Sequence, residues 1–330
     1  MEKQVAGGPF FEDLEVGQVA ENAPAQTLTE GLAALHTAIV GDRLRLPLDT
    51  ELSRLVTGAV IAHPALVWDV VLGQSTVLTG RVIANLFYRG FIFRRFPSIG
   101  DTLYTTTEVV ALRQNRPRPG RAATGLAVLS IRSKDQHGRP VLDVSRCAML
   151  PLRNPEGRTP HNADLEQIPA ELDRNALGAA FAQWRLDRFR QSIPGSHFAN
   201  MVAGTIWEVA GGDVVSSAPE LARLQLNLAM VHHDSSAAGG RRLVYGGHTI
   251  GLAASQAARA LPNLVTIVAW HSCDHLAPVR EADTLRSSVE LERTEPLDNG
   301  GLVHLRSRVR TDRESGTEEV LDWRFVGVMA

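Results

Sequence analysis

The feature that constrains this chain most is an internal repeat. When the sequence is shifted by about 182 residues, residues 60–74 fall on residues 242–256, and Asp101-Thr-Leu103 falls on Asp283-Thr-Leu285. Elsewhere the offset drifts by only a few residues, as insertions in loops would cause. A chain of 330 residues has room for two domains of ordinary size. The sequence therefore predicts two copies of one domain.

Both copies contain the same order of predicted elements. A long apolar helix is expected at residues 64–78 in the first copy and at residues 247–261 in the second. β-Branched residues with period-two alternation then predict three strands in each copy. These strands are expected at residues 103–112, 125–133 and 142–150, and at residues 284–294, 301–311 and 319–328. An apolar helix followed by hairpin-linked strands is typical of an α+β fold, in which an antiparallel sheet curls around a central helix.

The repeat also predicts the domain boundaries. We expect one domain at residues 9–152 and the other at residues 188–330. The segment between them, residues 153–187, begins with the Pro, Gly and Asn residues that are typical of a linker. Apolar residues at helical spacing across residues 171–190 predict a bridging helix there.

Composition excludes several classes of partner. The formal net charge is −2, so a polybasic surface for nucleic acid is not expected. No apolar run approaches the roughly 20 residues that a membrane-spanning helix needs. The two cysteines, Cys147 and Cys273, imply no disulfide framework, which favours a location in the reducing cytoplasm.

One stretch of the second copy carries groups suited to proton transfer. Asn227, His232 and Asp234 follow one another at spacings of five and two residues. An imidazole with a pKa near neutrality is the usual general acid and base of enzymes. Each flanking side chain has another interpretation, because Asn and Asp also cap local turns. The sequence therefore predicts His232 as a catalytic residue, with Asn227 and Asp234 as its candidate partners.

A second stretch begins the predicted helix of the second copy. Tyr245, Gly246, Gly247 and His248 lead directly into it. The first N–H groups of a helix have no partner within the helix and lie at the positive end of its dipole. Such groups can stabilise a carbonyl oxygen that gains negative charge. We expect Gly246 and Gly247 to supply these amides, and Tyr245 and His248 to line the same pocket.

Together these segments resemble the MaoC-like dehydratases, the (R)-specific or type 2 enoyl-CoA hydratases, in their double-hotdog form. The motif of that family is Gly-Asp-x-Asn-Pro-x-His-x-Asp, followed by Val-His-Gly at the start of the hotdog helix. The second copy has Asn227 in place of the first aspartate of the motif, and it retains His232 and Asp234. Tyr245-Gly246 stands where His-Gly is expected.

The first copy matches the motif less well. Asp42 and Asp49 correspond to its two aspartates, whereas Pro47 replaces its histidine and His63-Pro64 replaces its His-Gly. The resemblance therefore implies that the second copy holds the active site and that the first copy supplies binding surface for the acyl or pantetheine group.

The resemblance also implies an activity. Within the family, the sequence is most similar to the mesaconyl-CoA hydratases, also called β-methylmalyl-CoA dehydratases. We therefore expect reversible hydration of an enoyl-CoA thioester, with a branched or dicarboxylic acyl group such as mesaconyl favoured. His232 would be the general acid and base, Asn227 would orient the water, and Asp234 would orient an imidazole or replace the missing base. An acyl-CoA is the expected small-molecule partner, no cofactor is expected, and a homodimer is possible.

Two alternative functions remain open. A hotdog thioesterase would use a carboxylate on the hotdog helix, for which Asp69 is a candidate. A protein that binds acyl-CoA without turnover would explain the incomplete motifs. The histidines and cysteine of residues 271–275 could suggest zinc, but they lack the spacing of known zinc motifs, so no metal is expected. Arginines at residues 89–95 and 241–242 could bind the phosphates of CoA or could simply be surface charges.

Overall fold

A computed structural model describes residues 7–168, 172, 174–314 and 316–330. Two antiparallel four-stranded units form one continuous sheet, whose strand order is β1-β4-β5-β6-β3-β9-β12-β11-β10-β7. The first unit contains β3 (Ala84–Phe93), β4 (Thr102–Gln114), β5 (Thr124–Lys134) and β6 (Pro140–Pro151). The second contains β9 (Leu264–His275), β10 (Thr284–Leu297), β11 (Gly300–Arg313) and β12 (Gly316–Met329). The short strands β1 (Val19–Ala20), β2 (Gln26–Thr27), β7 (Ile206–Glu208) and β8 (Asp213–Val214) extend the outer edges of the sheet.

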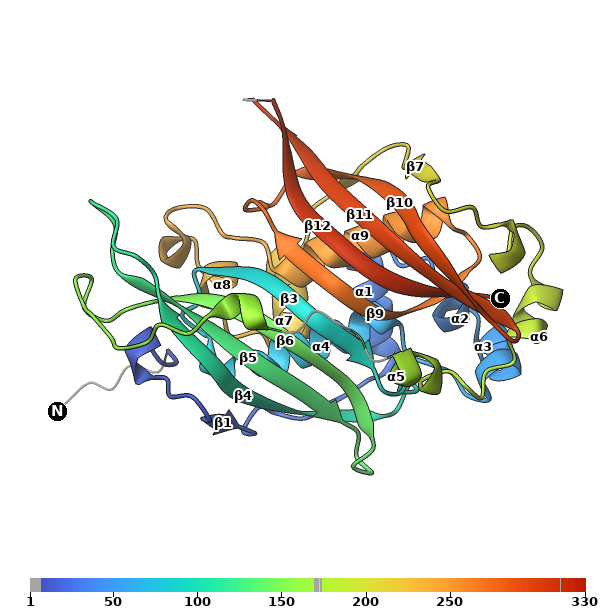
Figure 1. The fold of residues 1–330 in the computed structure, drawn as a ribbon, viewed down its shortest axis with the longest axis horizontal. Coiled ribbons are helices and arrows are strands. Elements are labelled where there is room, and N and C mark those ends of the chain that lie inside the picture. The colour runs from blue at the N-terminus through green and yellow to red at the C-terminus, as the bar shows by residue number, and fades with distance from the viewer. Residues whose placement is uncertain (1–6, 169–171, 173, 315) are drawn as a thin grey trace.

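Each unit curls around one central helix (Figure 1). These helices are α4 (Pro64–Gln74) in the first copy and α9 (Gly246–Ala260) in the second. Every residue of α4 is buried, which explains why its sequence is apolar except for Asp69 and Gln74. Its first turn is capped by His63, whose Nδ1 accepts a hydrogen bond of 3.0 Å from the N–H of Ala65. The double-hotdog α+β fold is thus confirmed.

The two copies meet at β3 and β9, which pair antiparallel. An aromatic cluster packs behind this junction. Trp68 of α4 makes edge contacts with Trp270 of β9 and Trp323 of β12, at ring-centroid distances of 5.0 and 6.2 Å. All three indoles are fully buried. Burial of such large rings makes the junction part of the hydrophobic core.

Shorter helices cover the concave side of the sheet and connect the copies (Figure 1). They are α1 (Glu30–Val40), α2 (Arg45–Leu48), α3 (Thr50–Thr57), α5 (Arg174–Ala179), α6 (Leu186–Ser192), α7 (Ala218–Leu224) and α8 (Met230–His233). Short 3-10 turns occur at Phe11–Asp13, Ser75–Leu78, Leu165–Gln167, Phe198–Asn200 and Ser236–Ala238.

The structure differs from the sequence-based expectations in two respects. Each copy has a fourth strand that was not predicted, β3 or β9, and these are the strands that join the copies. The bridging helix expected over residues 171–190 is two short helices, α5 and α6, with a turn between them. The turn lets Trp184 reach the ring of Phe96, 4.9 Å away. Residues 171 and 173 of that expected helix lie outside the described residues.

None of the helices in the described part of the chain is both long and apolar enough to cross a membrane.

Candidate active site

A cavity of about 950 Å³ lies at the junction of the two copies. The first copy contributes the start of β3 and part of β6 to its wall, and the second contributes α8, the start of α9 and the end of β9. The polar or charged side chains of this wall include Tyr88, Arg146, Asn227, His232, Tyr245 and His275. Of the predicted site residues, the cavity therefore brings together Asn227, His232, Tyr245 and Gly246.

The segment that carries Asn227 and His232 is held in place by the first copy. The N–H of Leu228 donates to the Oγ1 of Thr76 over 2.9 Å, and the N–H of Met230 donates to the carbonyl of Gly80 over 3.0 Å. Upstream of these bonds, the carbonyl oxygen of Gln225 lies so close to Gly73 of α4 that a Cβ there would be 1.9 Å from it. The degenerate copy therefore positions the candidate catalytic segment of its partner copy.

His232 is buried, and one of its ring nitrogens is already bonded. Its Nδ1 lies 2.8 Å from the carbonyl oxygen of Leu243, so Nδ1 carries the proton and Nε2 is the free acceptor. Nε2 has no hydrogen-bond partner among the residues that the structure describes. Burial, with the neighbouring charges of His233 and Arg146, lowers the pKa of His232 to about 4. The ring is therefore neutral at pH 7 and can accept a proton.

The side-chain amide of Asn227 has one atom bonded in a local turn and one atom available to a ligand. Its Oδ1 accepts a hydrogen bond of 2.9 Å from the N–H of Ala229, which forms the turn leading into α8. Its Nδ2 has no partner among the described residues, and the side chain lines the cavity. The amide can therefore cap the turn and still donate a hydrogen bond to a ligand.

Gly246 begins α9 on the cavity wall. As the first residue of the helix, it has an N–H without a partner in the helix. A Cβ at this position would be 2.6 Å from the Nε2 of His275, so only glycine leaves room for that ring. Thr249, one helical turn later, faces the same cavity.

Gly247 and His248 do not line this cavity, although the sequence placed them there. Each residue of a helix is rotated by about 100° from the one before it, so they face the first copy instead. A Cβ on Gly247 would be 2.1 Å from the Oδ1 of Asp69. His248 is fully buried, and burial lowers its pKa to about 4.

Asp234 lies outside the cavity as well. It is exposed at the end of α8, and its carboxylate accepts hydrogen bonds from the N–H and Oγ of Ser236, each 2.8 Å long. These bonds hold the pKa of Asp234 below its ordinary value. The carboxylate therefore stabilises a local turn, which is the structural alternative that its sequence context left open.

Asp69 is sealed in the core between the two central helices. Its Oδ2 accepts hydrogen bonds of 3.0 Å from the Nε2 of His36 and from the Nε2 of Gln225. Burial raises the pKa of this carboxyl group. Because Asp69 is fully buried and does not line the cavity, it has no access to a thioester there. This placement opposes the thioesterase alternative.

The motif residues of the first copy form a separate buried pair. The Nε2 of His63 contacts the carboxylate of Asp42, which the sequence had left without a histidine partner. Neither residue lines the His232 cavity. Asp42 also accepts a hydrogen bond of 3.1 Å from the N–H of Leu44. In this copy the residues of the motif stabilise the fold.

Sequence reasoning missed two side chains of the cavity. Arg146 of β6 is 4% exposed, and its guanidinium donates to the Oγ of Ser75 over 3.0 Å and also to the Oγ1 of Thr79. No carboxylate pairs with it among the described residues. His275 faces Gly246, and burial lowers its pKa to about 4. A single buried Arg in an alternating strand gives no sequence signal that distinguishes it from an exposed one.

The histidines and the cysteine of residues 271–275, the candidate zinc ligands, do not converge on one point. His271 lies 3.0 Å from the Nδ1 of His304, Cys273 is buried in the core, and only His275 reaches the cavity. Within the described ranges, no three His, Cys, Asp or Glu side chains are grouped as a metal site would require.

Most of the described arginines outside the cavity form salt bridges with carboxylates. Arg89 pairs with Asp274, Arg94 pairs with Asp143, and Arg242 pairs with Glu281. Arg95 likewise contacts carboxylates of neighbouring turns. These partners favour the interpretation of residues 89–95 and Arg242 as surface charges.

Comparisons with known proteins agree with this architecture. No model of a known protein family matches the chain. The chain is 30% identical to the β-methylmalyl-CoA dehydratase of Chloroflexus aurantiacus over 86% of its own length and 82% of that protein. It is 29% identical to the mesaconyl-CoA hydratase of Cereibacter sphaeroides over 91% of its length and 88% of that protein.

Two solved structures share the whole fold. RV0216 of Mycobacterium tuberculosis, a conserved hypothetical protein with a double hotdog fold, has 50% identity and a TM-score of 0.91, over 98% of this chain and 99% of that one. A putative MaoC domain protein dehydratase from Chloroflexus aurantiacus has 26% identity and a TM-score of 0.85, over 99% of both chains. With its duplicated hotdog architecture and its junction cavity, the chain belongs to the MaoC-like hydro-lyase family, in the double-hotdog form that includes CoA-thioester hydratases and dehydratases.

Proposed function

We propose that this protein catalyses the reversible hydration of an enoyl-CoA thioester in the cavity at His232. The observation that carries the proposal is the shared wall on which the free Nε2 of His232 and the first amide of α9, at Gly246, both lie. Hydration of a conjugated thioester requires a base for water and a donor for the thioester oxygen, and this wall offers one of each.

In the hydration direction, Nε2 of His232 takes a proton from water while the water oxygen bonds to the β-carbon. The electron pair of the carbon–carbon double bond moves towards the thioester, and the N–H of Gly246 stabilises the charge that develops on its oxygen. The imidazolium then returns its proton to the α-carbon. The lowered pKa of His232 makes that imidazolium a stronger acid than an exposed one, which favours the return of the proton.

Asn227 assists this step by orientation. Its Nδ2 donates to the water or to the product hydroxyl, since its Oδ1 is held by Ala229. Asp234 has no role in the proposal, because its carboxylate lies outside the cavity. Tyr245 contributes its ring, which packs edge-on against His232 at a centroid distance of 5.8 Å.

The acyl group that the cavity favours is dicarboxylic, and Arg146 is the reason. A buried guanidinium without a carboxylate partner carries an uncompensated charge, which is costly in a protein interior. A second carboxylate on the acyl group would accept the remaining N–H donors of Arg146 and offset that cost. This supports a substrate of the mesaconyl-CoA kind over a simple aliphatic enoyl-CoA.

The proposed reaction needs no metal or redox cofactor, because the imidazole and the amide supply both functions. We also propose that the enzyme works in the cytoplasm, because its two cysteines, Cys147 and Cys273, are both free thiols. The association of two copies of the chain into a homodimer stays a prediction.

A panel of mesaconyl-, itaconyl- and crotonyl-CoA tests the function after the protein has been dialysed against a chelator. We expect loss of the enoyl-thioester absorbance without release of free thiol, and the largest kcat/KM with mesaconyl-CoA. Release of thiol at the rate of absorbance loss would identify a thioesterase instead. Binding of all three thioesters without any turnover would identify a non-catalytic acyl-CoA binder.

A further inference from the structure

A second cavity, of about 1140 Å³, opens beside the first. Its wall is formed by the end of β4, the connection to β5 and the loop that follows β6. Ile83, Leu86, Arg121 and Met149 line both this cavity and the His232 cavity, so the two cavities are adjacent. A long ligand held at His232 therefore has this second space next to it.

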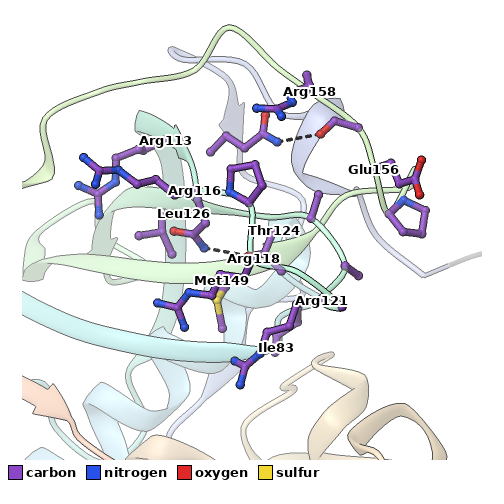
Figure 2. Close-up of a pocket in the computed structure, with 18 of the residues that line it drawn as sticks. Ile83, Arg113, Arg116, Arg118, Arg121, Thr124, Leu126, Met149, Glu156 and Arg158 are labelled. Carbon is purple, nitrogen blue, oxygen red and sulfur yellow. Dashed lines mark hydrogen bonds between the residues drawn. The ribbon is translucent and has the colours of Figure 1, made fainter.

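Five arginines line the second cavity (Figure 2). They are Arg113, Arg116, Arg118, Arg121 and Arg158. Within the part of the chain that the structure describes, no salt bridge is formed by any of them. Among the described residues of the wall, the one acidic side chain is that of Glu156, which lies on the opposite side of the view from Arg113 and Arg116. The cavity is therefore strongly positive in a protein whose formal net charge is −2.

A third cavity differs from the second in the pairing of its cationic side chains. It also contains several cationic side chains, but there Arg94 pairs with Asp143, Arg132 with Glu108, and Arg139 with Asp135. Because carboxylates already engage these arginines, that cavity offers little free positive charge. The cavity that adjoins the candidate active site therefore carries more uncompensated guanidinium charge than the third cavity.

The arginine-lined cavity is held together by specific hydrogen bonds. The Nε2 of Gln114, at the end of β4, donates to the carbonyl of Gly157 over 2.8 Å, and its Oε1 accepts from the Oγ1 of Thr159 over 3.0 Å. The N–H of Ala123 donates to the carbonyl of Pro155 over 2.7 Å. These bonds fix the β4–β5 connection against the loop after β6, so the arginines from both segments face one space.

We infer that this cavity binds the phosphorylated nucleotide end of CoA, and the inference rests on the proposed function. CoA carries a diphosphate and a 3′-phosphate, and Arg is the side chain that best matches phosphate geometry. Arg121, on the wall of both cavities, lies where the pantetheine arm would meet the diphosphate. Ile83, Leu86 and Met149 offer apolar surface for the arm itself.

Direct binding tests the inference without any turnover. Wild-type protein and the double variant Arg116→Ser/Arg118→Ser are titrated by calorimetry with CoA, 3′-dephospho-CoA and pantetheine. We expect wild-type affinity to fall in that order, and the double variant to bind CoA about tenfold or more weakly, as loss of charge-assisted hydrogen bonds predicts. Higher salt should weaken wild-type binding of CoA more than that of pantetheine.

The control variant is Arg132→Ser, which removes an exposed arginine of β5 that pairs with Glu108 in the third cavity. It should bind CoA as the wild type does. Unchanged CoA affinity in the double variant, or equal wild-type affinity for CoA and pantetheine, would overturn the inference.

The same experiment separates this inference from the proposed function. A protein that hydrates enoyl-CoA but binds CoA equally well in wild type and double variant refutes the nucleotide site alone. A protein that needs these arginines to bind CoA but never turns over a thioester refutes the hydratase proposal alone.

Discussion

At the scale of single residues, burial decides which polar groups can take part in chemistry. His232 and Arg146 are both buried at the cavity wall with part of their hydrogen-bonding capacity unused. Asp234 and Asp69 have the right chemical type, but one is bonded to Ser236 at the surface and the other is sealed between helices. The accessible donors and acceptors therefore differ from those that the motif alone would select.

Arg146 gives the first prediction, which concerns selectivity. Replacing Arg146 with Gln should lower kcat/KM for mesaconyl-CoA by about ten- to hundredfold, because a charge-assisted hydrogen bond contributes about 1.5–3 kcal/mol. The value for crotonyl-CoA, which has no second carboxylate, should change much less. Steady-state kinetics with both thioesters measure the ratio. An equal loss with the two substrates would contradict a carboxylate-binding role.

A control for this variant is Arg306→Gln. Arg306 of β11 pairs with Asp322 and does not line the cavity. The Arg306→Gln variant should leave the ratio of the kcat/KM values for mesaconyl-CoA and crotonyl-CoA unchanged.

The residue scale is also where sequence reasoning was weakest. The placement of His232 and Gly246 on one cavity wall could be predicted, because an imidazole spaced before a glycine turn is a local pattern. Gly247 and His248 were misplaced because the rotation of successive helical residues depends on where the helix begins. Arg146 could not be predicted at all, because its partners, Ser75 and Thr79, are about 70 positions away in sequence.

At the scale of elements, the first copy supports the second. Helix α4 and the turn after it hold the segment before α8 by the Leu228–Thr76 bond and by the close approach of Gly73 to Gln225. The incomplete motif of the first copy is thus compatible with an active site, because its helix serves as the surface on which the catalytic segment rests.

Gly73→Ala tests this support. The new Cβ would be 1.9 Å from the carbonyl oxygen of Gln225, so α4 and the segment would have to separate. We expect the free energy of unfolding to fall by about 1–3 kcal/mol, as overpacking does, and hydratase turnover to fall with it. Denaturant unfolding and steady-state kinetics measure the two effects.

Gly178→Ala is the matched control, because Gly178 lies in helix α5 and no atom of the described residues is within 4 Å of its added Cβ. Its stability and turnover should equal or exceed those of the wild type. If Gly73→Ala behaved in the same way, the close packing between α4 and the segment would not matter to the site.

The elements themselves were largely predictable. Strand alternation and the apolar central helices are local signals, and the structure reproduces those elements within a few residues. β3 and β9 were not predicted, although residues 264–269 of β9 are rich in β-branched residues. Each strand pairs within its own copy as well as with the other copy. The break between α5 and α6 was not predicted, because it accompanies the tertiary contact of Trp184 with Phe96.

At the scale of the whole molecule, duplication places neutral imidazoles deep in the interior. Burial lowers the pKa values of His232, His248 and His275 to about 4. In the unfolded chain a histidine has a pKa of about 6.5. Between these values the unfolded state binds more protons than the folded state, so stability must fall as the pH is lowered through this window.

The predicted outcome is a fall of several kcal/mol in the free energy of unfolding between roughly pH 6.5 and pH 4. Asp69 has the opposite effect on stability, because its pKa is raised in the folded state. It is a single group, however, and its effect is opposed by the three buried histidines. Carboxylates such as Asp135, whose pKa is lowered, lose their contribution at more acidic pH. Denaturant unfolding across this range measures the change, and constant stability from pH 7 to pH 4.5 would contradict it.

The central claim is that His232 transfers the proton in a hydratase reaction. His232→Asn tests it most directly, because an amide nitrogen can still donate to the carbonyl of Leu243 but cannot exchange a proton in the reaction. The control is His137→Asn, an exposed imidazole in the turn between β5 and β6. The measurement is the single-turnover rate with mesaconyl-CoA, taken with the unfolding midpoint of each variant. We predict a loss of about 10²–10⁴-fold for His232→Asn with the fold retained, and no loss for the control. A His232→Asn protein that hydrates mesaconyl-CoA at the wild-type rate would contradict the account.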